Sequence, residues 1–362
     1  MINTEILYDI IGRGLRAPSG DNCQPWKFVY DKNNDFIDVH IVPERAKAFL
    51  DVDLKATCIS IGAVIENISI AAKKSGYDSE FIYFPDENDD GLCARVKLTE
   101  SSKEEGMYPF IDKRSTNRRP FLPYKKIPVN VIKQLEESVK GNNSRLILSD
   151  NSKLKRKAAL MAAKSDWIRY NNEIMHTEFM EKIRFSRKES EMKHDGFDTG
   201  HLGIGKAGVL FLRSLKPWKR MKFLNKFAGM NKMMSLSTAA MIMSSSNVGL
   251  IYTDNSTPGD FIKGGRDLER FWLTAAANNV LVQPMTVITL FIERIKKGQN
   301  NGFNAKEDIF ARKLYEDFKE IFPVTDKNGL ILLFRLGYGF PLKELSLRRP
   351  IQEMLTIKGI QR

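Results

Sequence analysis

The 362-residue chain contains little cysteine and no long uninterrupted apolar segment. Its three cysteines, Cys23, Cys58 and Cys93, are too few for a disulfide framework, and none stands in a CxxC or other metal-like spacing with the four histidines. No apolar run reaches the length of about 18 residues that spans a membrane. The nearest, residues 329–334, is followed by Arg335, as at the end of a buried strand. We therefore expect reduced thiols and no metal site.

The N-terminal segment lacks the basic stretch and apolar core of an export signal and carries Glu5 and Asp9 instead. A cytoplasmic protein is therefore expected. The net charge of +13 indicates anionic partners, which include phosphorylated cofactors, nucleic acids and lipid surfaces, and charge alone does not distinguish among them. Basic residues concentrate at 113–126, at 153–157 and at 213–232, where seven cations occur without an acidic residue.

Apolar periodicity indicates a globular chain that begins with a helix, a strand hairpin and a second helix. Hydrophobic residues make up 42% of the sequence, which is enough for a core. The predicted elements are a helix at 5–16, strands at 26–30 and 36–42, and a helix at 58–72 that stops near Gly76.

An internal repeat relates two helical segments of the chain. Residues 62–72 align without a gap on 265–275 at a constant offset of 203, with Gly, Glu and Ala at matching places. A strand-like run closes each half, at 94–98 and at 330–336. The alternative explanation is that any two amphipathic helices share an apolar stripe. We favour a duplicated unit.

The repeat predicts an α+β fold made of two related α/β halves that are fused in one chain. Residues 1–106 are expected to form a degenerate N-terminal half and residues 107–362 the C-terminal half. The charged segment at 100–112 is the expected join.

Residues 17–26, with the sequence APSGDNCQPW, form a short polar loop. Small residues, backbone N–H groups and side-chain amides suit the edge of a flat heterocycle, although a solvent-exposed turn is the more common explanation of such residues. The pattern APSxxNxQPW closely resembles the flavin-contacting motif of the nitroreductase superfamily. That resemblance implies FMN as the cofactor, contacted on its ring or ribityl chain by Pro18, Ser19, Gly20 and Asn22.

A basic loop at 114–121, RSTNRRPF, resembles the segment that holds the FMN phosphate in the same superfamily. Guanidinium and hydroxyl groups on one loop suit charge-assisted phosphate contacts, whereas a basic loop by itself is more often a solvated surface. The resemblance implies phosphate contacts from Arg114, Ser115, Thr116 and Arg118.

The two motifs occur in the order opposite to that of ordinary family members, and each half keeps only one of them. This arrangement resembles the fused, Acg-like branch of the superfamily and implies one complete FMN site per chain. Residues 264–276 resemble the family's central helix. Further contacts are implied near flavin N5 from the backbone of Pro284, Met285 and Thr286, and near the phosphate from Arg348 and Arg349.

The resemblance implies an FMN-dependent oxidoreductase that uses NAD(P)H to reduce a nitroaromatic, quinone or similar flat acceptor. The cofactor carries the chemistry, so no catalytic acid or base is expected. A flavin-sequestering or redox-sensing protein is the alternative, and a lipid- or nucleic-acid-binding protein the third. We expect no nucleic-acid partner, and either a monomeric pseudo-dimer or a homo-oligomer.

Residues 160–240 lie outside the resemblance. The GxGxxG match at 203–208 lacks the preceding buried strand and the following acid of a dinucleotide site. In residues 211–232, apolar side chains recur every three residues among cations, and Pro217 predicts a helix start or a kink. The two readings are a lid over the flavin within 195–235, which we favour, and an amphipathic helix on an anionic membrane.

Overall fold

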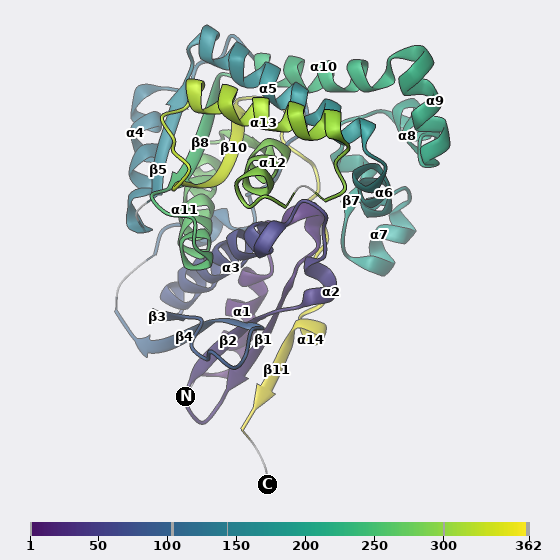
Figure 1. Ribbon diagram of the computed structural model, residues 1–362. Helices are drawn as coiled ribbons and strands as arrows, with labels where there is room; N and C mark the ends of the chain where they lie inside the picture. The colour runs from purple at the N-terminus through teal and green to yellow at the C-terminus, as the bar shows by residue number, and fades with distance from the viewer. Residues whose placement is uncertain (1, 103–104, 143, 300, 360–362) are drawn as a thin grey trace.

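The computed structural model describes residues 2–102, 105–142, 144–299 and 301–359. Two mainly antiparallel sheets lie at opposite sides of a central helix pair, and the two ends of the described chain lie at the N-terminal sheet (Figure 1). The α+β class that the sequence predicts is therefore confirmed. The expected join at 100–112 includes residues 103–104, which lie outside the described residues.

The N-terminal half consists of a helix, a hairpin, a long helix and two further strands. The strand order is β1-β2-β4-β3, with every neighbour antiparallel. The predicted hairpin is confirmed, with Asp31 opposite Phe36 at its turn. The elements are α1 (Thr4–Gly14), β1 (Trp26–Asp31), β2 (Phe36–Ile41), α2 (Pro43–Ala46), α3 (Lys55–Lys74), β3 (Tyr77–Tyr83) and β4 (Leu92–Glu100).

Helix α3 begins earlier than its apolar pattern predicts. The carboxylate of Asp51 accepts hydrogen bonds from the backbone N–H groups of Ala56 at 2.6 Å and Thr57 at 3.1 Å. These bonds satisfy amides of the first turn that have no partner within the helix. A capping carboxylate several residues before the helix does not contribute to the apolar periodicity. For this reason the periodicity alone predicted that the helix starts at residue 58.

The C-terminal half repeats the topology of the first. Its strand order is β5-β8-β10-β9, again with every neighbour antiparallel. Each half therefore runs helix, two strands, long helix, two strands, and its last strand pairs with both the second and the third. The elements are α4 (Val129–Ser138), β5 (Ser144–Ser149), β8 (Asn247–Thr253), α11 (Pro258–Ala277), β9 (Leu281–Pro284) and β10 (Gly329–Gly337).

Two helical insertions and a C-terminal tail are added to this repeated unit. One insertion separates β5 from β8 and the other separates β9 from β10. The tail returns to the other half, where its last strand pairs in parallel with β1 (Figure 1). The predicted halves, 1–106 and 107–362, do not include this return of the C-terminal tail to the N-terminal sheet.

The insertions and tail comprise α5 (Ser152–Asn171), α6 (Glu173–Lys182), β6 (Ile183–Arg184), α7 (Arg187–Lys193), β7 (Phe197–Asp198), α8 (Lys206–Ser214), α9 (Trp218–Ala228), α10 (Met230–Met243), α12 (Thr286–Lys296), α13 (Ala305–Ile321), α14 (Ile351–Met354) and β11 (Leu355–Lys358). Short 3₁₀ turns lie at η1 (Gly20–Asn22), η2 (Val52–Leu54), η3 (Tyr108–Phe110), η4 (Lys140–Asn142) and η5 (Thr199–His201).

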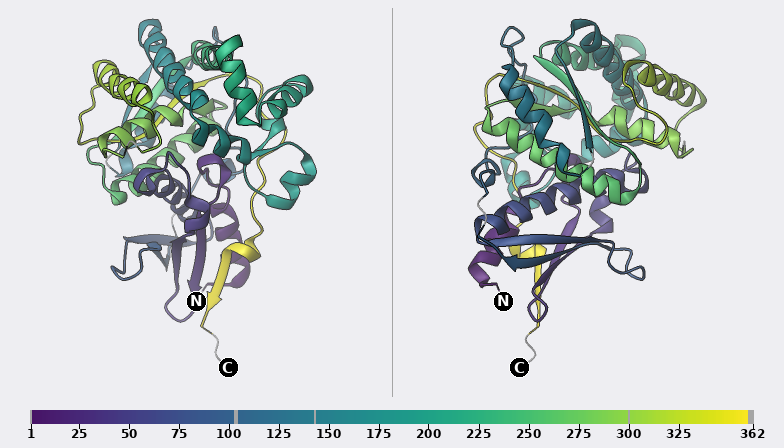
Figure 2. Two further views of the ribbon diagram at one scale, coloured as in Figure 1. Left: turned by 45° about the vertical axis from the view of Figure 1, so that its right-hand side comes forward. Right: turned by 90° about the vertical axis from the view of Figure 1, so that its left-hand side faces the viewer.

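Helices α3 and α11 pack against each other at two glycines between the sheets (Figure 2). A Cβ atom on Gly62 would lie 2.0 Å from the carbonyl oxygen of Ile262, and one on Gly265 would lie 2.0 Å from that of Ile59. The offset of 203 that relates Gly62 to Gly265 also relates Ile59 to Ile262. The contact is therefore reciprocal, as across a two-fold interface.

The matching glutamates of the two helices have different partners. Glu66 pairs with Arg266 at 2.9 Å and with Arg270 at 2.5 Å, both on α11. Glu269, which corresponds to Glu66 under the same offset, instead pairs with Arg114 at 3.2 Å. The repeat thus loses its symmetry where the second motif of the sequence approaches the central helices.

One described stretch, residues 52–74, is long and apolar enough to cross a membrane by composition alone. It contains α3, and 78% of its apolar window is buried inside the protein. Because α3 packs on α11, α1 and the N-terminal sheet, its apolar surface is that of a core helix.

Candidate functional site

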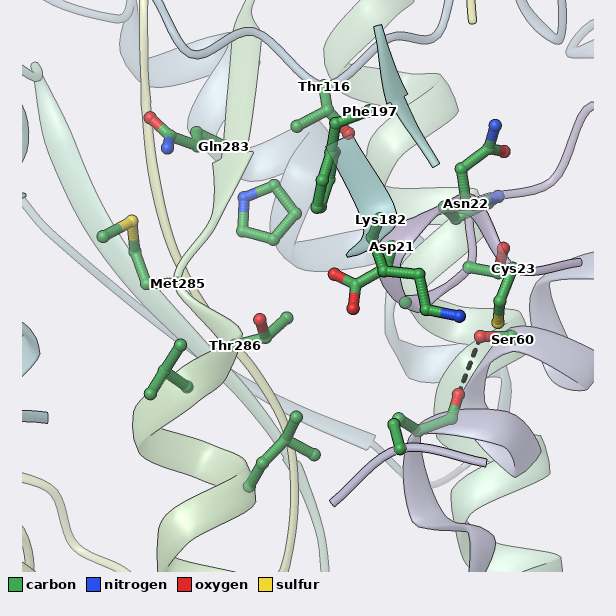
Figure 3. Close-up of a pocket in the computed structure, with 18 of the residues that line it drawn as sticks. Asp21, Asn22, Cys23, Ser60, Thr116, Lys182, Phe197, Gln283, Met285 and Thr286 are labelled. Carbon is green, nitrogen blue, oxygen red and sulfur yellow. Dashed lines mark hydrogen bonds between the residues drawn. The ribbon is translucent and has the colours of Figure 1, made fainter. Parts of the chain in front are cut away.

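A cavity of about 530 Å³ lies between the two halves. Figure 3 shows Asp21, Asn22 and Cys23 from the N-terminal half on one side and Met285 and Thr286 from the C-terminal half on the other. All of the predicted site residues except Arg349 line this cavity. They are Pro18, Ser19, Gly20, Asn22, Arg114, Ser115, Thr116, Arg118, Pro284, Met285, Thr286 and Arg348.

The N-terminal loop of the site is held in a left-handed backbone conformation by Gln24. Asp21, Asn22 and Gln24 have φ values of 51°, 54° and 50°, which costs energy for residues other than glycine. The buried Gln24 amide donates to the carbonyls of Asn22 at 3.2 Å and His194 at 2.7 Å and accepts from the Arg349 N–H at 2.8 Å. One side chain therefore joins the loop, the insertion and the C-terminal tail.

The side chain of Asn22 is directed away from the cavity (Figure 3). Its amide donates to the Leu347 carbonyl at 3.1 Å and accepts from the Arg348 guanidinium at 2.9 Å. The side chain of Asn22 therefore braces the loop, while Asn22 itself lines the cavity. A contact between Asn22 and the flavin stays a prediction.

Arg348 is fully committed to protein acceptors. Its guanidinium donates to the carbonyls of Leu15 at 2.8 Å and Ala17 at 3.0 Å, and also to those of Arg16, Ser346 and Leu347. Burial lowers the pKa of Arg348 well below its ordinary value. This arginine fastens the tail to the loop and leaves no donor for a phosphate. Arg349 lies outside the cavity lining and pairs with Asp195 at 3.1 Å.

The second motif is fixed to the edge of the C-terminal sheet. Thr116 forms a bridge with Val282 of β9, and the Asn117 N–H donates to the Val282 carbonyl at 3.2 Å. This contact places the side chains of Ser115, Thr116 and Arg118 at the cavity. None of these three side chains forms a hydrogen bond with any residue that the structure describes.

Arg118 is a cation without an ion pair among the described residues. Its guanidinium lies 4.8 Å from the ring centroid of Phe197. Burial lowers the pKa of Arg118 to about 10, and the nearby Asp21 opposes this shift. The group remains charged at neutral pH and is available to an anion in the cavity.

Arg114 is held more firmly than Arg118. It is 4% exposed, pairs with Glu269, donates to the Arg16 carbonyl at 2.5 Å and lies 5.0 Å from the ring of Trp272. Burial raises the pKa of Glu269 to about 7, although Arg114 acts in the opposite direction. Arg114 lines the cavity, and its pair with Glu269 ties the second motif to the central helices.

Glu269 predicts a pH dependence of stability. Because its folded-state pKa of about 7 exceeds its ordinary value of 4.5, the folded protein binds this proton more tightly than the unfolded chain does. The stabilisation is complete below pH 4.5 and is lost as the pH rises through about 7. At about 1.4 kcal/mol per pKa unit, it reaches about 3 kcal/mol.

Urea unfolding of the wild type and of Glu269→Gln at pH 5, 6 and 8 checks this. We expect the wild type to gain stability relative to the variant as the pH falls. Parallel pH curves for the two proteins would show that Glu269 titrates normally.

Residues of the insertion complete the cavity, and sequence reasoning did not identify them. Arg169 and Lys182 of the insertion line it together with the half-buried Asp21 of the first loop. Desolvation raises the pKa of the Asp21 carboxyl, and the charges of Arg169, Lys182 and Arg118 oppose this shift. Figure 3 shows Lys182 beside Asp21 and Phe197 beside Thr116. The residues of the insertion lie outside both sequence motifs, so no motif could have identified them. Asp21 differs, because it lies within the motif at 17–26.

The opposite wall is the turn from β9 into α12. Pro284 has no N–H, and the Met285 N–H donates to the Leu333 carbonyl at 2.7 Å. Thr286 begins α12, and no hydrogen bond from its N–H to a described residue is formed. Of the three backbone positions expected near a ring nitrogen, Thr286 is the one with a free donor.

Part of the segment at 195–235, in which we expect a lid, lines the cavity, and the lid itself stays a prediction. Residues 211–232 do not line the cavity. The insertion instead contributes Phe197, Leu202 and Ile204 on one side and Thr238 and Met241 of α10 on the other. Pro217 does precede a helix start, at α9, as predicted. Four apolar side chains between these flanks pack with α6 in a small core of their own, namely Leu212, Leu215, Met221 and Met230.

Among the residues that the structure describes, no group of three or more His, Cys, Asp or Glu side chains is placed to hold a metal ion. The three cysteines are free. Cys23 lines the cavity, and burial raises the pKa of its thiol to about 12, so that it stays protonated at neutral pH.

No protein-family model matches the chain. Among curated proteins, it is 26% identical over 342 residues to an uncharacterized protein of Mycobacterium tuberculosis (strain CDC 1551 / Oshkosh). This match covers 92% of this chain and 46% of that protein. An uncharacterized protein of M. tuberculosis (strain ATCC 25618 / H37Rv) is 28% identical over 112 residues, 29% of this chain and 33% of that protein. The chain thus spans less than half the length of these curated relatives.

Three solved structures match about 70% of this chain at low sequence identity. A nitroreductase-like family protein from Bacillus cereus is 12% identical with a TM-score of 0.37, and the match covers 71% of this chain and 98% of that one. An FMN-dependent nitroreductase from Mycobacterium smegmatis in complex with NADPH is 11% identical with a TM-score of 0.37, and the match covers 70% of this chain and 96% of that one. An iodotyrosine deiodinase bound to FMN and 3-iodo-L-tyrosine is 13% identical with a TM-score of 0.35, and the match covers 68% of this chain and 96% of that one.

Proposed function

We propose that this chain is an FMN-dependent oxidoreductase of the nitroreductase superfamily that holds one FMN between two fused halves. The observation that carries the proposal is that residues 18–22 and 114–118, from different halves, line one cavity. Its volume of about 530 Å³ falls within the range of sites for small molecules and cofactors.

The donors of the cavity suit the two ends of FMN. Ser115, Thr116 and Arg118 offer two hydroxyls and a guanidinium without partners in the described chain, a set suited to a phosphate. The Thr286 N–H, at the first turn of α12, suits an acceptor atom on a ring edge. The apolar side chain of Leu268 contributes to the wall between them.

The single site follows from the unequal halves. The connection between α1 and β1 contains the loop at 18–22, whereas the matching connection between α4 and β5, at 139–143, is too short for such a loop. Residue 143 lies outside the described residues. Duplication of one unit, followed by loss of one motif from each half, accounts for this difference.

FMN, when bound, accepts a hydride from a nicotinamide and passes electrons to an acceptor. The residues of this chain hold and shield it. Arg118 neutralises phosphate charge, and Phe197, Leu202 and Ile204 limit access of water from the insertion side. A nitroaromatic, quinone or similar flat acceptor is the proposed substrate class, with NAD(P)H as the donor. A cytoplasmic location and the assembly state remain predictions.

Anaerobic mixing of the FMN-loaded protein with NADH or NADPH tests the activity. We expect the visible absorbance of the bound flavin to disappear within seconds with at least one of the two donors and to return when a quinone or a nitroaromatic is added. Arg119→Gln, whose side chain lies outside the cavity lining, is the control and should behave as the wild type.

A flavin that stays oxidised in the presence of both donors would contradict the enzyme and favour sequestration of FMN. Failure of the protein to bind FMN at all would reject both functions.

A further inference from the structure

The surface formed by α8, α9 and α10 carries only positive charge. Residues 206–253 contain eight basic and no acidic residues. All eight side chains are exposed, and none forms an ion pair with a residue in the described part of the chain. They are Lys206, Arg213, Lys216, Lys219, Arg220, Lys222, Lys226 and Lys232.

The same three helices expose large apolar side chains. Seven of them are between 41% and 67% exposed, within a stretch of 34 residues, a density that marks an interaction surface. They are Leu210, Phe211, Phe223, Phe227, Met233, Leu236 and Met243.

These apolar side chains face outward because other residues of the same helices already fill the core beneath them. On α9, Met221 and Leu224 pack inward with α6 and α8. Phe223 and Phe227 are one turn apart with ring centroids 4.7 Å from each other, and a helical period places them on the side opposite Met221. Helices α8 and α9 lie at the periphery of the molecule (Figure 1).

On α10 the exposed apolar residues also form a stripe. Met233, Leu236 and Met243 recur at intervals of three and seven residues, which puts them on one face. Thr238 and Met241 of the same helix line the cavity on another face. Anything bound to the exposed stripe therefore lies next to the candidate site.

We propose that the exposed face of α8, α9 and α10 docks on an anionic phospholipid bilayer. Apolar side chains enter the acyl boundary, and the surrounding cations contact lipid phosphates, which is the chemistry of an interfacial amphipathic helix. We expect binding to need both parts, because the apolar side chains and the cations contact different parts of the bilayer.

The charge excludes a second copy of this chain as the occupant, because a two-fold contact would set eight cations against eight cations without an acid between them. A nucleic acid would neutralise the cations but would leave Leu210, Met233 and Leu236 without an apolar partner.

Co-sedimentation of the full chain with vesicles tests the proposal. We expect binding to vesicles of phosphatidylcholine mixed with phosphatidylglycerol, little binding to phosphatidylcholine alone, and release by added salt. Phe223→Ser with Phe227→Ser should weaken binding at least about tenfold. Lys222→Gln with Lys226→Gln should weaken it by roughly fivefold for each cation.

Matched controls remove equally exposed groups elsewhere. Val129→Ser with Ile309→Ser, and Lys306→Gln with Lys313→Gln, should bind vesicles as the wild type does. Circular dichroism confirms that each variant is folded. The proposal is overturned if the wild type does not bind the anionic vesicles, if the Phe223/Phe227 variant binds as its control does, or if only RNA is bound.

Discussion

Gly265→Ala is expected to destabilise the protein by about 3 to 5 kcal/mol. The new methyl group would lie 2.0 Å from the carbonyl oxygen of Ile59, and that oxygen belongs to a helix backbone that cannot move by itself. Helices α3 and α11 would have to separate, and the contact between the two halves would be lost along their length. Gly62→Ala should cost a similar amount, because it makes the reciprocal clash with Ile262.

Urea unfolding of the two single variants, their double variant and a control variant, each compared with the wild type, measures this effect. Gly12→Ala is the control, since a Cβ at this position of α1 meets nothing within 4 Å, and it should raise stability by up to about 1 kcal/mol. The double variant of Gly62 and Gly265 should cost less than the sum of the single ones, because the helices are already separated after the first change. Near-neutral single variants would mean that the halves do not pack through this contact.

Arg118→Gln is expected to weaken FMN binding by roughly 10- to 100-fold, the loss of one charge-assisted contact of about 1.5 to 3 kcal/mol. The stability of the protein without FMN should change little, because Arg118 forms no ion pair or hydrogen bond with the described chain and its burial is already unfavourable. Fluorescence titration with FMN measures the affinity, and urea unfolding measures the stability.

Two neighbouring arginines sharpen this test. Arg119→Gln should bind FMN as the wild type does, because the side chain lies outside the cavity lining and donates to the Pro341 carbonyl. Arg348→Gln should lower stability, because the guanidinium bonds of Arg348 fasten the tail to the loop at 15–22. If all three variants bind FMN equally well, the phosphate lies elsewhere.

The sequence predicted those parts of the fold that depend on local pattern. Alternating residues placed the hairpin whose register sets Asp31 opposite Phe36. The repeated Gly62 and Gly265 identified the central helices before their contact was known. Both motifs of the site were found because their residue types and spacing are specific, and they line the same cavity.

Other features depend on contacts between distant residues, which no local pattern contains. The pairing of Leu355 with Phe28 joins the two ends of the described chain. The side-chain amide of Asn22 is bonded to Arg348 and to the Leu347 carbonyl, which lie more than 300 residues away. The insertion supplies Phe197 and Lys182 to the cavity from residues 160–240, which lie outside the resemblance.

The number of FMN molecules bound per chain tests the central claim most directly. The protein is loaded with FMN, freed of excess, and denatured, and the released flavin is counted against the protein concentration, with the assembly state measured on the same sample. We predict one FMN for each chain, in a monomer as well as in any oligomer. Two per chain would mean that each half holds a site, and one per two chains would mean that the site forms between chains. Either result would contradict a single FMN held between the loop at 18–22 and the motif at 114–118 of one chain.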